Sequence, residues 1–272
     1  MKVMKLYNYK VAKHKGESLF PNLWPNGGWY CPSLQSLNGP RLFDISGRNA
    51  HATLTSMEVE TDWIISENKG ALDFDGVNDS CNITSSRILT IYPFTLSGWA
   101  YPRAVPAASA AILSVGTNNS NYFAIGFVNL SGNLRPTIIG RNTTFVQNFP
   151  TTNYSLNQWY HLVGVFASAT SRILYINGIR VVEGTTSVPE YQVNSTPRIG
   201  SGYATLFLNA LIDDCRIFSN QAFNPYDVQT LYQLGRGRLP AIPNRSLGNI
   251  TTTTFKSHWL TKRPNLIGGG LR

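Results

Sequence analysis

The stretch RILYINGIRVVEG, residues 172–184, decides the fold class. Its two halves are rich in β-branched and aromatic residues, and Asn177-Gly178 lies between them. An Asn-Gly pair accepts positive φ at both central positions of a type I′ turn, the commonest two-residue connection between antiparallel strands. The stretch therefore predicts a β-hairpin.

Similar short runs occur on both sides of this hairpin. They are FTLSGWAYP (94–102), AAILSVG (110–116), NYFAIGFV (121–128), RPTIIGR (135–141), NQWYHLVGVFA (157–167) and ALIDDCRIF (210–218). Gly, Asn, Pro and Ser separate them at strand-like spacing. Such a series is typical of an antiparallel sandwich or barrel.

A single helix is predicted in NPYDVQTLYQLG, residues 224–235. Asn224 can cap its start, and Pro225 suits the first helical position. Asp227 favours the N-terminal end of the helix dipole, and Gly235 can end the helix. We expect this short helix to close one end of the sandwich.

Length and composition limit the size of the domain and the cellular compartment in which it is expected. With 272 residues, of which 42% are hydrophobic, the chain can bury a full core. No apolar run approaches the roughly 18 residues that span a bilayer, and lysines replace the apolar segment of a signal peptide. Cys31, Cys81 and Cys215 are odd in number and lack CxxC spacing, which indicates buried thiols in place of disulfides or a zinc site.

The net charge of +9 is distributed unevenly along the chain. Residues 1–16 carry five lysines and no acid, residues 228–272 carry seven basic residues and no acid, and the remainder has a net charge of −3. We therefore predict a basic N-terminal arm (1–16), a globular domain (17–235) and a basic extended C-terminal arm (236–272).

Arms of a single charge sign attract an anionic partner, such as an acidic neighbouring subunit or nucleic acid. The alternative is a pair of solvated tails. The residues expected to dock the arms are Lys2, Lys5, Lys10, Lys13, Lys15, Arg236, Arg238, Arg245, Lys256, Trp259, Lys262, Arg263 and Arg272.

Four longer stretches together carry a family resemblance. They are KGALDFDGVNDSCNI (69–83), PFTLSGWAYP (93–102), LNQWYHLVGVFASATSRILYINGIRVVEG (156–184) and RIGSGYATLFLNALIDDCRIFSNQAFNPYDVQTLYQLGRG (198–237). In this order and spacing they resemble the laminin-G-like branch of the concanavalin A-like lectin/glucanase superfamily. The resemblance implies an all-β, two-sheet antiparallel jelly-roll sandwich with one short C-terminal helix.

The flanking stretches NLWPNGGWYCPSL (22–34) and LYQLGRGRLP (231–240) resemble laminin-G-like proteins encoded by bacteriophages and prophages. This resemblance implies a structural or decoration protein of a phage virion, made in the host cytoplasm. We expect such a protein to display the jelly roll, to dock its arms on neighbouring virion subunits and to act as a homo-oligomer within the assembly. The alternative is a glycan-binding adhesin or receptor-binding module for host or mucus sugars.

A glycoside hydrolase is a third alternative. The resemblance implies that catalytic carboxylates would stand on one strand as Glu-x-Asp-x-Glu, with period-two spacing, and this string does not occur. Glu58 and Glu60 share a strand parity but lack the middle Asp. We therefore expect no enzyme activity.

The stretch ALDFDGVNDSCNI, residues 71–83, concentrates carboxylates. Asp75-Gly76 followed by Asn78-Asp79 is typical turn chemistry, so it predicts a hairpin turn closed by Asx hydrogen bonds. The alternative is calcium, which takes oxygen ligands and which some members of the resembled superfamily bind near the sandwich rim. The nominated ligands are Asp75, Asn78, Asp79 and Asp214, and no other cofactor is expected.

Two further expectations concern side-chain directions. Asp213 and Asp214 are adjacent in a predicted strand, so only one of them can reach any one site. The aromatic residues Tyr122, Phe123, Tyr191, Tyr203 and Phe207 occupy loop-like settings. We nominate Tyr122, Tyr191 and Tyr203 for stacking on sugar rings, with core packing as the alternative.

Overall fold

The computed structural model describes residues 29–31, 39–46, 48–66, 69–83, 88–89, 91–190, 194–203 and 206–236. The predicted N-terminal arm lies outside these residues, and so does the C-terminal arm except for Arg236. The docking role of the arms therefore stays a prediction.

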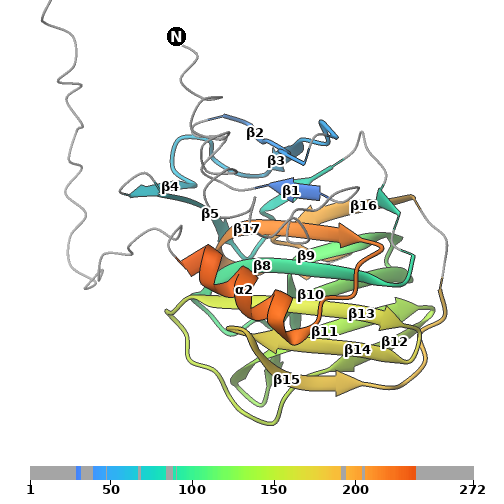
Figure 1. Cartoon of the computed structure of the whole chain (residues 1–272). Coiled ribbons are helices and arrows are strands. Elements are labelled where there is room, and N and C mark those ends of the chain that lie inside the picture. The colour runs from blue at the N-terminus through green and yellow to red at the C-terminus, as the bar shows by residue number, and fades with distance from the viewer. Residues whose placement is uncertain are drawn as a thin grey trace, which may run out of the picture. The chain divides into compact units, whose positions relative to one another are not determined.

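The described strands form two antiparallel sheets (Figure 1). One is eight-stranded, with the order β15 (Ile179–Gly184), β14 (Ser171–Ile176), β13 (Tyr160–Ser168), β8 (Phe94–Pro102), β17 (Asn209–Ser219), β5 (Lys69–Asp75) and β4 (Trp63–Ser66), while β1 (Trp29–Cys31) also pairs with β17.

The other sheet is nine-stranded and faces the first across the core. Its order is β12 (Thr144–Asn148), β11 (Asn133–Asn142), β10 (Asn121–Leu130), β9 (Ser109–Asn118), β16 (Asn194–Ile199), β6 (Ser80–Asn82), β3 (Ala52–Thr55) and β2 (Arg41–Leu42), while β7 (Ile88–Leu89) also pairs with β16. The predicted fold class, a two-sheet antiparallel jelly-roll sandwich, is confirmed.

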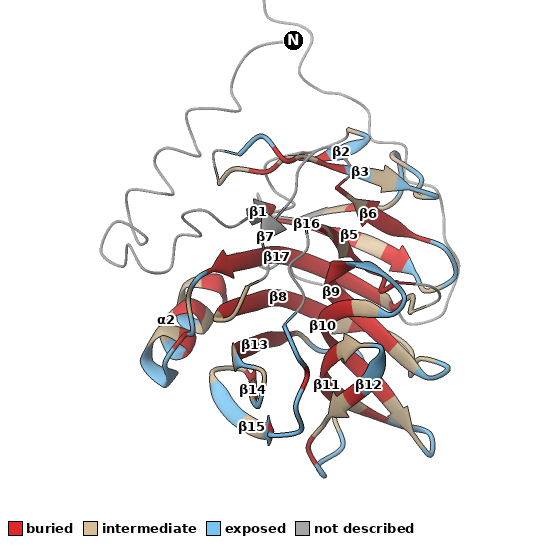
Figure 2. Ribbon diagram, turned by 90° about the vertical axis from the view of Figure 1, so that its right-hand side faces the viewer, coloured by how far each residue is buried: buried red, intermediate tan, exposed pale blue. Residues whose placement is uncertain are grey.

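Aromatic rings from both sheets meet at the centre of the core. Figure 2 shows that the central strands of both layers are largely buried. Phe94 of β8 stacks on Phe166 of β13 with ring centroids 4.6 Å apart. Phe123 of β10 packs edge-on against both, at 5.1 Å and 5.2 Å. This three-ring cluster joins the two sheets.

The hairpin predicted at residues 172–184 is confirmed. β14 and β15 pair with Ile176 opposite Ile179. Asn177 and Gly178 have φ of 51° and 82°, as a type I′ turn requires.

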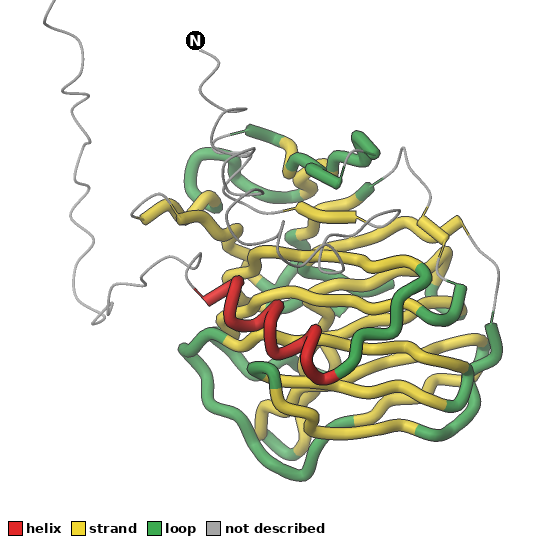
Figure 3. The backbone as a smooth tube through the Cα atoms, viewed as in Figure 1, coloured by secondary structure: helices red, strands yellow, loops and turns green. Residues whose placement is uncertain are grey.

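The predicted helix is present as α2 (Pro225–Arg236), and its N-terminus is capped as expected. Asn224 Oδ1 accepts hydrogen bonds from the backbone N–H of Tyr226 at 2.8 Å and of Asp227 at 3.0 Å. The expected position was wrong, because α2 lies across the outer face of the eight-stranded sheet (Figure 3). It buries Val228 and Leu231 against that face.

The end of α2 also differs from the prediction. Gly235 lies within the last turn, and a Cβ there would be 2.3 Å from Trp99 Nε1. The glycine is thus required for close approach to the sheet, and the helix continues to Arg236. The Arg236 guanidinium lies 5.5 Å from the ring of Tyr232, so this residue belongs to the domain.

The three cysteines are buried and free, as expected. Cys31 of β1 lies opposite Cys215 of β17, and Cys81 belongs to β6 in the other sheet. The described residues contain no helix with the length and apolar character that a bilayer crossing requires.

Replacement of Phe166 by Ala should lower the free energy of unfolding by about 3–5 kcal/mol, because it empties the centre of the three-ring cluster. Urea denaturation measures the change. The control is Tyr226→Ala on α2, where the side chain is 67% exposed and the expected change is within about 0.5 kcal/mol. A loss below about 1 kcal/mol for Phe166→Ala would show that this cluster does not hold the sheets together.

Candidate functional site

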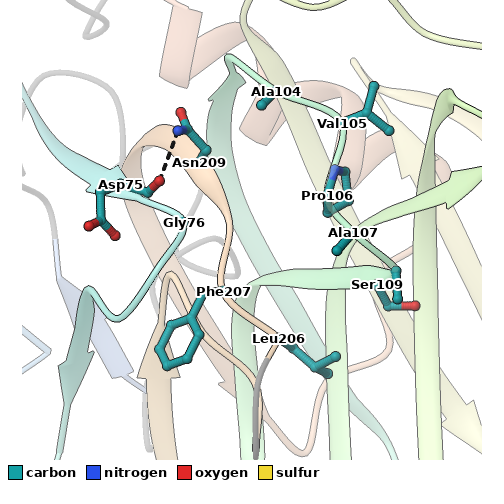
Figure 4. A pocket seen from close by; sticks show the side chains of 11 residues that line it. Asp75, Gly76, Ala104, Val105, Pro106, Ala107, Ser109, Leu206, Phe207 and Asn209 are labelled. Atoms are coloured by element: carbon teal, nitrogen blue, oxygen red, sulfur yellow. Dashed lines mark hydrogen bonds between the residues drawn. The ribbon is translucent and has the colours of Figure 1, made fainter.

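A cleft opens at the rim of the sandwich, where three connections meet (Figure 4). These are the turn after β5, the segment between β8 and β9, and residues 206–209 at the start of β17. Its volume of about 490 Å³ is typical of small-molecule sites. The lining residues are Asp75, Gly76, Ala104, Val105, Pro106, Ala107, Ala108, Ser109, Leu206, Phe207 and Asn209.

One wall of the cleft is the segment 104–109, and β10 holds it in place. The backbone N–H of Asn129 donates to Ala108 O at 2.7 Å. The Asn129 side-chain amide donates to Pro106 O at 3.0 Å. The two hydrogen bonds from Asn129 therefore fix this wall before a ligand binds.

The opposite wall contains residues 206–209. Leu206 O accepts from the backbone N–H of Ala111 at 3.1 Å, and Asn209 Nδ2 donates to Asp75 O at 2.8 Å (Figure 4). Gly76 has φ of 79°, and a Cβ there would be 2.7 Å from Asn209 N. Only glycine permits this close approach between the turn and β17.

Arg103 joins the two walls at the base of the segment 104–109. It forms an ion pair with Asp73, with Nη1 2.7 Å from Asp73 Oδ2, and its Nε donates to Asn209 Oδ1 at 2.9 Å. The Arg103 side chain is a third exposed, so the ion pair adds little to the stability of the fold. Its main effect is to fix the positions of Asp73 and Asn209 relative to each other. Arg103 sets the spacing of the cleft.

Most residues that line the cleft are apolar, but its surface is about as polar as it is apolar. Val105, Pro106 and Phe207 are half-buried, and Ala107 and Ala108 are exposed. The polar lining residues are Asp75, Ser109 and Asn209. This mixture suits a neutral ligand that combines an apolar face with hydroxyl groups.

The acidic turn beside the cleft has the geometry predicted for a turn. Asp75 Oδ1 accepts from the backbone N–H of Val77 at 2.7 Å and of Asn78 at 3.3 Å. Asp79 Oδ2 accepts from the backbone N–H of Asp75 at 2.8 Å. The carboxylates thus close the turn after β5.

The two carboxyl groups have pKa values shifted in opposite directions. Burial raises the pKa of Asp79 from 3.8 to about 6, with the charges of Asp75 and Asp62 adding to the effect. Partial burial acts in the same sense on Asp75, but hydrogen bonds from the N–H groups of Val77, Asn78 and Asp79 prevail and lower its pKa. Below about pH 6, a neutral Asp79 beside an ionised Asp75 relieves the repulsion within the turn.

The structure does not bring Asp214 to the other nominated calcium ligands. Asp75 lies opposite Asn209, and Asp214 is five residues further along β17. Asp214 is 1% exposed, and its carboxylate accepts from Arg216 Nη2 at 3.0 Å. As a set of four the nomination was wrong, because this carboxylate is held by a buried arginine.

The remaining nominated ligands, Asp75, Asn78 and Asp79, lie together in the turn. Among the described residues, no group of three or more His, Cys, Asp or Glu has a metal-binding arrangement. Calcium binding at the turn stays a prediction.

A serine–histidine pair lies beneath α2. Ser97 Oγ and His161 Nε2 are 3.0 Å apart, and the His161 ring packs against the rings of Trp99 and Tyr232, which also stack on each other. Burial lowers the pKa of His161 to about 3; the nearby Asp214 opposes the shift and Arg216 adds to it. Both members of the pair are fully buried, so a substrate cannot reach them and their role is packing.

The aromatic residues nominated for sugar stacking are not available. Tyr122 is 1% exposed and Tyr203 is 2% exposed, and their ring centroids lie 5.7 Å apart on the outer face of the nine-stranded sheet. Tyr203 donates its hydroxyl to the backbone there, because the chain around it folds back on the sheet. Tyr191 lies outside the described residues.

Two other aromatic residues are accessible. Phe207 lines the cleft, and Phe145 on β12 is 44% exposed. Phe207 was among the aromatic residues noted in the sequence, but its setting did not separate it from Tyr203. Phe145 was missed, because TTFVQN reads as an ordinary alternating strand without an indication that this face is open.

Comparison with known proteins agrees with the fold. The family model described as concanavalin A-like lectin/glucanases superfamily matches residues 75–229. This match confirms the family resemblance seen in the sequence, whereas a phage origin gains no support from it. No curated protein matches the chain in a sequence comparison.

Solved structures with the same fold include parts of carbohydrate-active proteins. Domain 4 of AbnA, a GH43 extracellular arabinanase from Geobacillus stearothermophilus, in complex with arabinotriose, has a TM-score of 0.56 and 18% identity, over 75% of this chain and 97% of that one. Trypanosoma rangeli sialidase has a TM-score of 0.56 and 16% identity over 79% of this chain, which spans only 33% of the sialidase. The binding domain of Paraclostridial Mosquitocidal Protein 1 has a TM-score of 0.52 and 17% identity, over 75% of this chain and 51% of that one.

These similarities correct the expectation that the chain is not an enzyme. The similar structures belong to an arabinanase and a sialidase, so the missing Glu-x-Asp-x-Glu string does not separate this fold from enzymes. At these identities the likeness concerns the fold alone.

Titration of Asp79 should change the free energy of unfolding. Because the pKa of Asp79 is raised from 3.8 to about 6 in the folded state, the folded state binds this proton more tightly than the unfolded state does. The resulting stabilisation is lost as pH rises from about 4 through 6. Asp79→Asn removes the effect. The difference in free energy of unfolding between the variant and the wild type should therefore change by about 1 kcal/mol between pH 5 and pH 7, in favour of the variant at pH 7.

The difference between the two proteins is the proper measure, because His161 titrates with the opposite sign in this window. Its lowered pKa gives stability that is lost as pH falls below about 6.5, equally in both proteins. Urea denaturation at pH 5, 6 and 7 supplies the values. A difference that is constant with pH would mean that Asp79 is ionised throughout.

Proposed function

We propose that this chain, which belongs to the concanavalin A-like lectin/glucanases superfamily, binds carbohydrate in the rim cleft beside Phe207. The observation that carries the proposal is a preformed cleft with a half-buried aromatic ring and a surface that combines apolar and polar groups in similar measure. Sugar rings present an apolar C–H face to aromatic side chains and hydroxyl groups to polar ones.

The geometry supports binding without rearrangement. Both walls are fixed by hydrogen bonds to the sheets, and Arg103 sets their spacing. A preformed site loses little conformational entropy when a ligand binds. The complex of arabinanase domain 4 with arabinotriose, a domain of almost the same extent as this one, makes a neutral oligosaccharide the first ligand to test.

A second proposal concerns display on a phage particle, with the basic arms contacting neighbouring subunits. It is supported by the acid-free composition of residues 1–16 and 228–272 and by the sequence resemblance. It is compatible with carbohydrate binding, since a displayed domain can recognise sugars on a host. Mass spectrometry of gradient-purified particles tests it: stoichiometric amounts support display, and protein found only outside the particles refutes it.

Phe207→Ala should weaken carbohydrate binding at least about tenfold, because the ring provides the stacking surface of the cleft. Isothermal titration calorimetry with arabinotriose and a panel of neutral oligosaccharides measures the affinity. The matched control is Tyr226→Ala, which removes an exposed ring on α2 and should leave binding unchanged. If the wild-type protein binds no sugar across the panel, the proposed function is wrong.

A further inference from the structure

The two sheets differ in charge. The described strands of the nine-stranded sheet contain no Asp or Glu, and their basic residues are Arg41, Arg135, Arg141 and Arg198. The strands of the eight-stranded sheet contain the acids Asp73, Asp75, Glu183, Asp213 and Asp214. The nine-stranded sheet is therefore the basic side of the sandwich.

Arg141 and Arg198 lie on the outer face of this sheet. Arg141 is directly opposite Tyr122, whose ring belongs to the outer cluster with Tyr203. The guanidinium of Arg198 lies 4.3 Å from the centroid of the Tyr203 ring. The two arginines thus frame one pair of tyrosine rings.

Neither arginine has a carboxylate partner among the described residues. Arg103, Arg180 and Arg216 each form an ion pair with a carboxylate of the eight-stranded sheet. By contrast, Arg141 contacts neutral groups: the amide oxygen of Asn119 at 3.4 Å, the hydroxyl of Tyr122 and the ring of Phe145. No carboxylate of the described residues forms an ion pair with the Arg141 guanidinium.

Glu190 is the carboxylate to consider beside this region, since Pro189 O accepts a hydrogen bond from Asn142 of β11. Oε1 of Glu190 accepts from the backbone N–H of Tyr92 at 2.7 Å. Within the part of the chain that the structure describes, Glu190 forms no ion pair with Arg141.

An exposed aromatic ring lies next to the Arg141 guanidinium. Phe145 on the edge strand β12 is directly opposite Arg141 in register, and the guanidinium is 5.9 Å from its ring centroid. The ring is 44% exposed. A flat apolar surface and an uncompensated cation therefore stand side by side, and we call Arg141, Phe145 and Asn119 the Arg141 patch.

The patch is connected with the rim cleft. Gln147 lies two residues beyond Phe145 on β12, and its amide donates to Ser109 Oγ at 2.9 Å. Ser109 lines the cleft. A side chain of the strand that carries Phe145 thus contacts a residue that lines the cleft.

We propose that the Arg141 patch binds an anionic sugar unit, one that carries a carboxylate or a sulfate group. The Phe145 ring stacks on the C–H face of the sugar, and the Arg141 guanidinium pairs with the anionic group. Arg198, at the far side of the tyrosine pair, adds to the positive potential of this face. The proposal rests on the proposed function only in taking a saccharide as the ligand.

The test is calorimetric titration of the full chain with three tetrasaccharides: an oligogalacturonate, its carboxyl-reduced neutral counterpart and a sulfated chondroitin fragment. We expect the wild-type protein to bind at least one anionic probe tenfold or more tightly than the neutral one, with affinity that falls as salt rises. The two anionic probes separate carboxylate from sulfate recognition. Arg141→Gln should abolish the preference, and Phe145→Ala should weaken binding of the same probe.

The matched control is Arg180→Gln, which removes one positive charge from an exposed arginine of the eight-stranded sheet. It should leave the preference intact, and an equal loss in this control would overturn the proposal by showing a general charge effect. Equal affinity of the wild type for the neutral and anionic probes would also overturn it. Tighter binding of a DNA duplex than of the anionic tetrasaccharides, with the duplex displacing them, would overturn it as well, because the patch would then bind nucleic acid.

Phe207→Ala separates the two sites. If the neutral probe depends on Phe207 while the anionic preference does not depend on Arg141, the proposed function stands and the Arg141 patch is refuted. If the anionic preference depends on Arg141 and no probe depends on Phe207, the patch stands and the cleft is refuted.

Discussion

The contact between the two sheets across one aromatic core is the interaction on which the rest of the structure depends. Phe94, Phe123 and Phe166 bring rings from both sheets together. The sheets can approach so closely because Gly164 has no side chain, and a Cβ there would lie 2.4 Å from Ile125 Cγ2. Once the sheets are held at this spacing, the ends of their strands are fixed, and with them the connections that form the rim.

The elements that could be predicted from the sequence are those whose signal is local. The Asn177-Gly178 turn and the Asn224 cap depend on residues next to each other in the chain, and both have the expected geometry. Side-chain direction along β17 could not be predicted, because the alternation of faces assumes a regular strand. The pairing of β17 with β8 shifts register between Asp213 and Arg216, and Asp214 has φ of 55°, so the strict alternation on which the expectation for Asp213 and Asp214 rested does not hold there.

The candidate site was predicted less well, for a related reason. The turn at Asp75 follows from local turn chemistry, but the cleft beside it was not predicted, and the exposure of each aromatic residue depends on segments distant in the sequence. Tyr203 is buried because its segment folds over Gly116, whereas Phe207, only four residues later, lines the cleft. The local sequence does not distinguish the buried ring of Tyr203 from the accessible ring of Phe207, so their exposure could not be predicted from a single sequence.

The distribution of charge gives the domain an orientation toward its surroundings. Asp73, Glu183 and Asp214 each pair with an arginine of the same layer or its rim, so the acidic sheet is largely compensated within itself. The arginines of the nine-stranded sheet lack such partners among the described residues, and the strands of this sheet carry no acid. The exposed ring of Phe145 lies directly opposite Arg141 on this sheet. Charge and stacking thus act at one place, which is the condition for selecting an anionic saccharide over a simple anion.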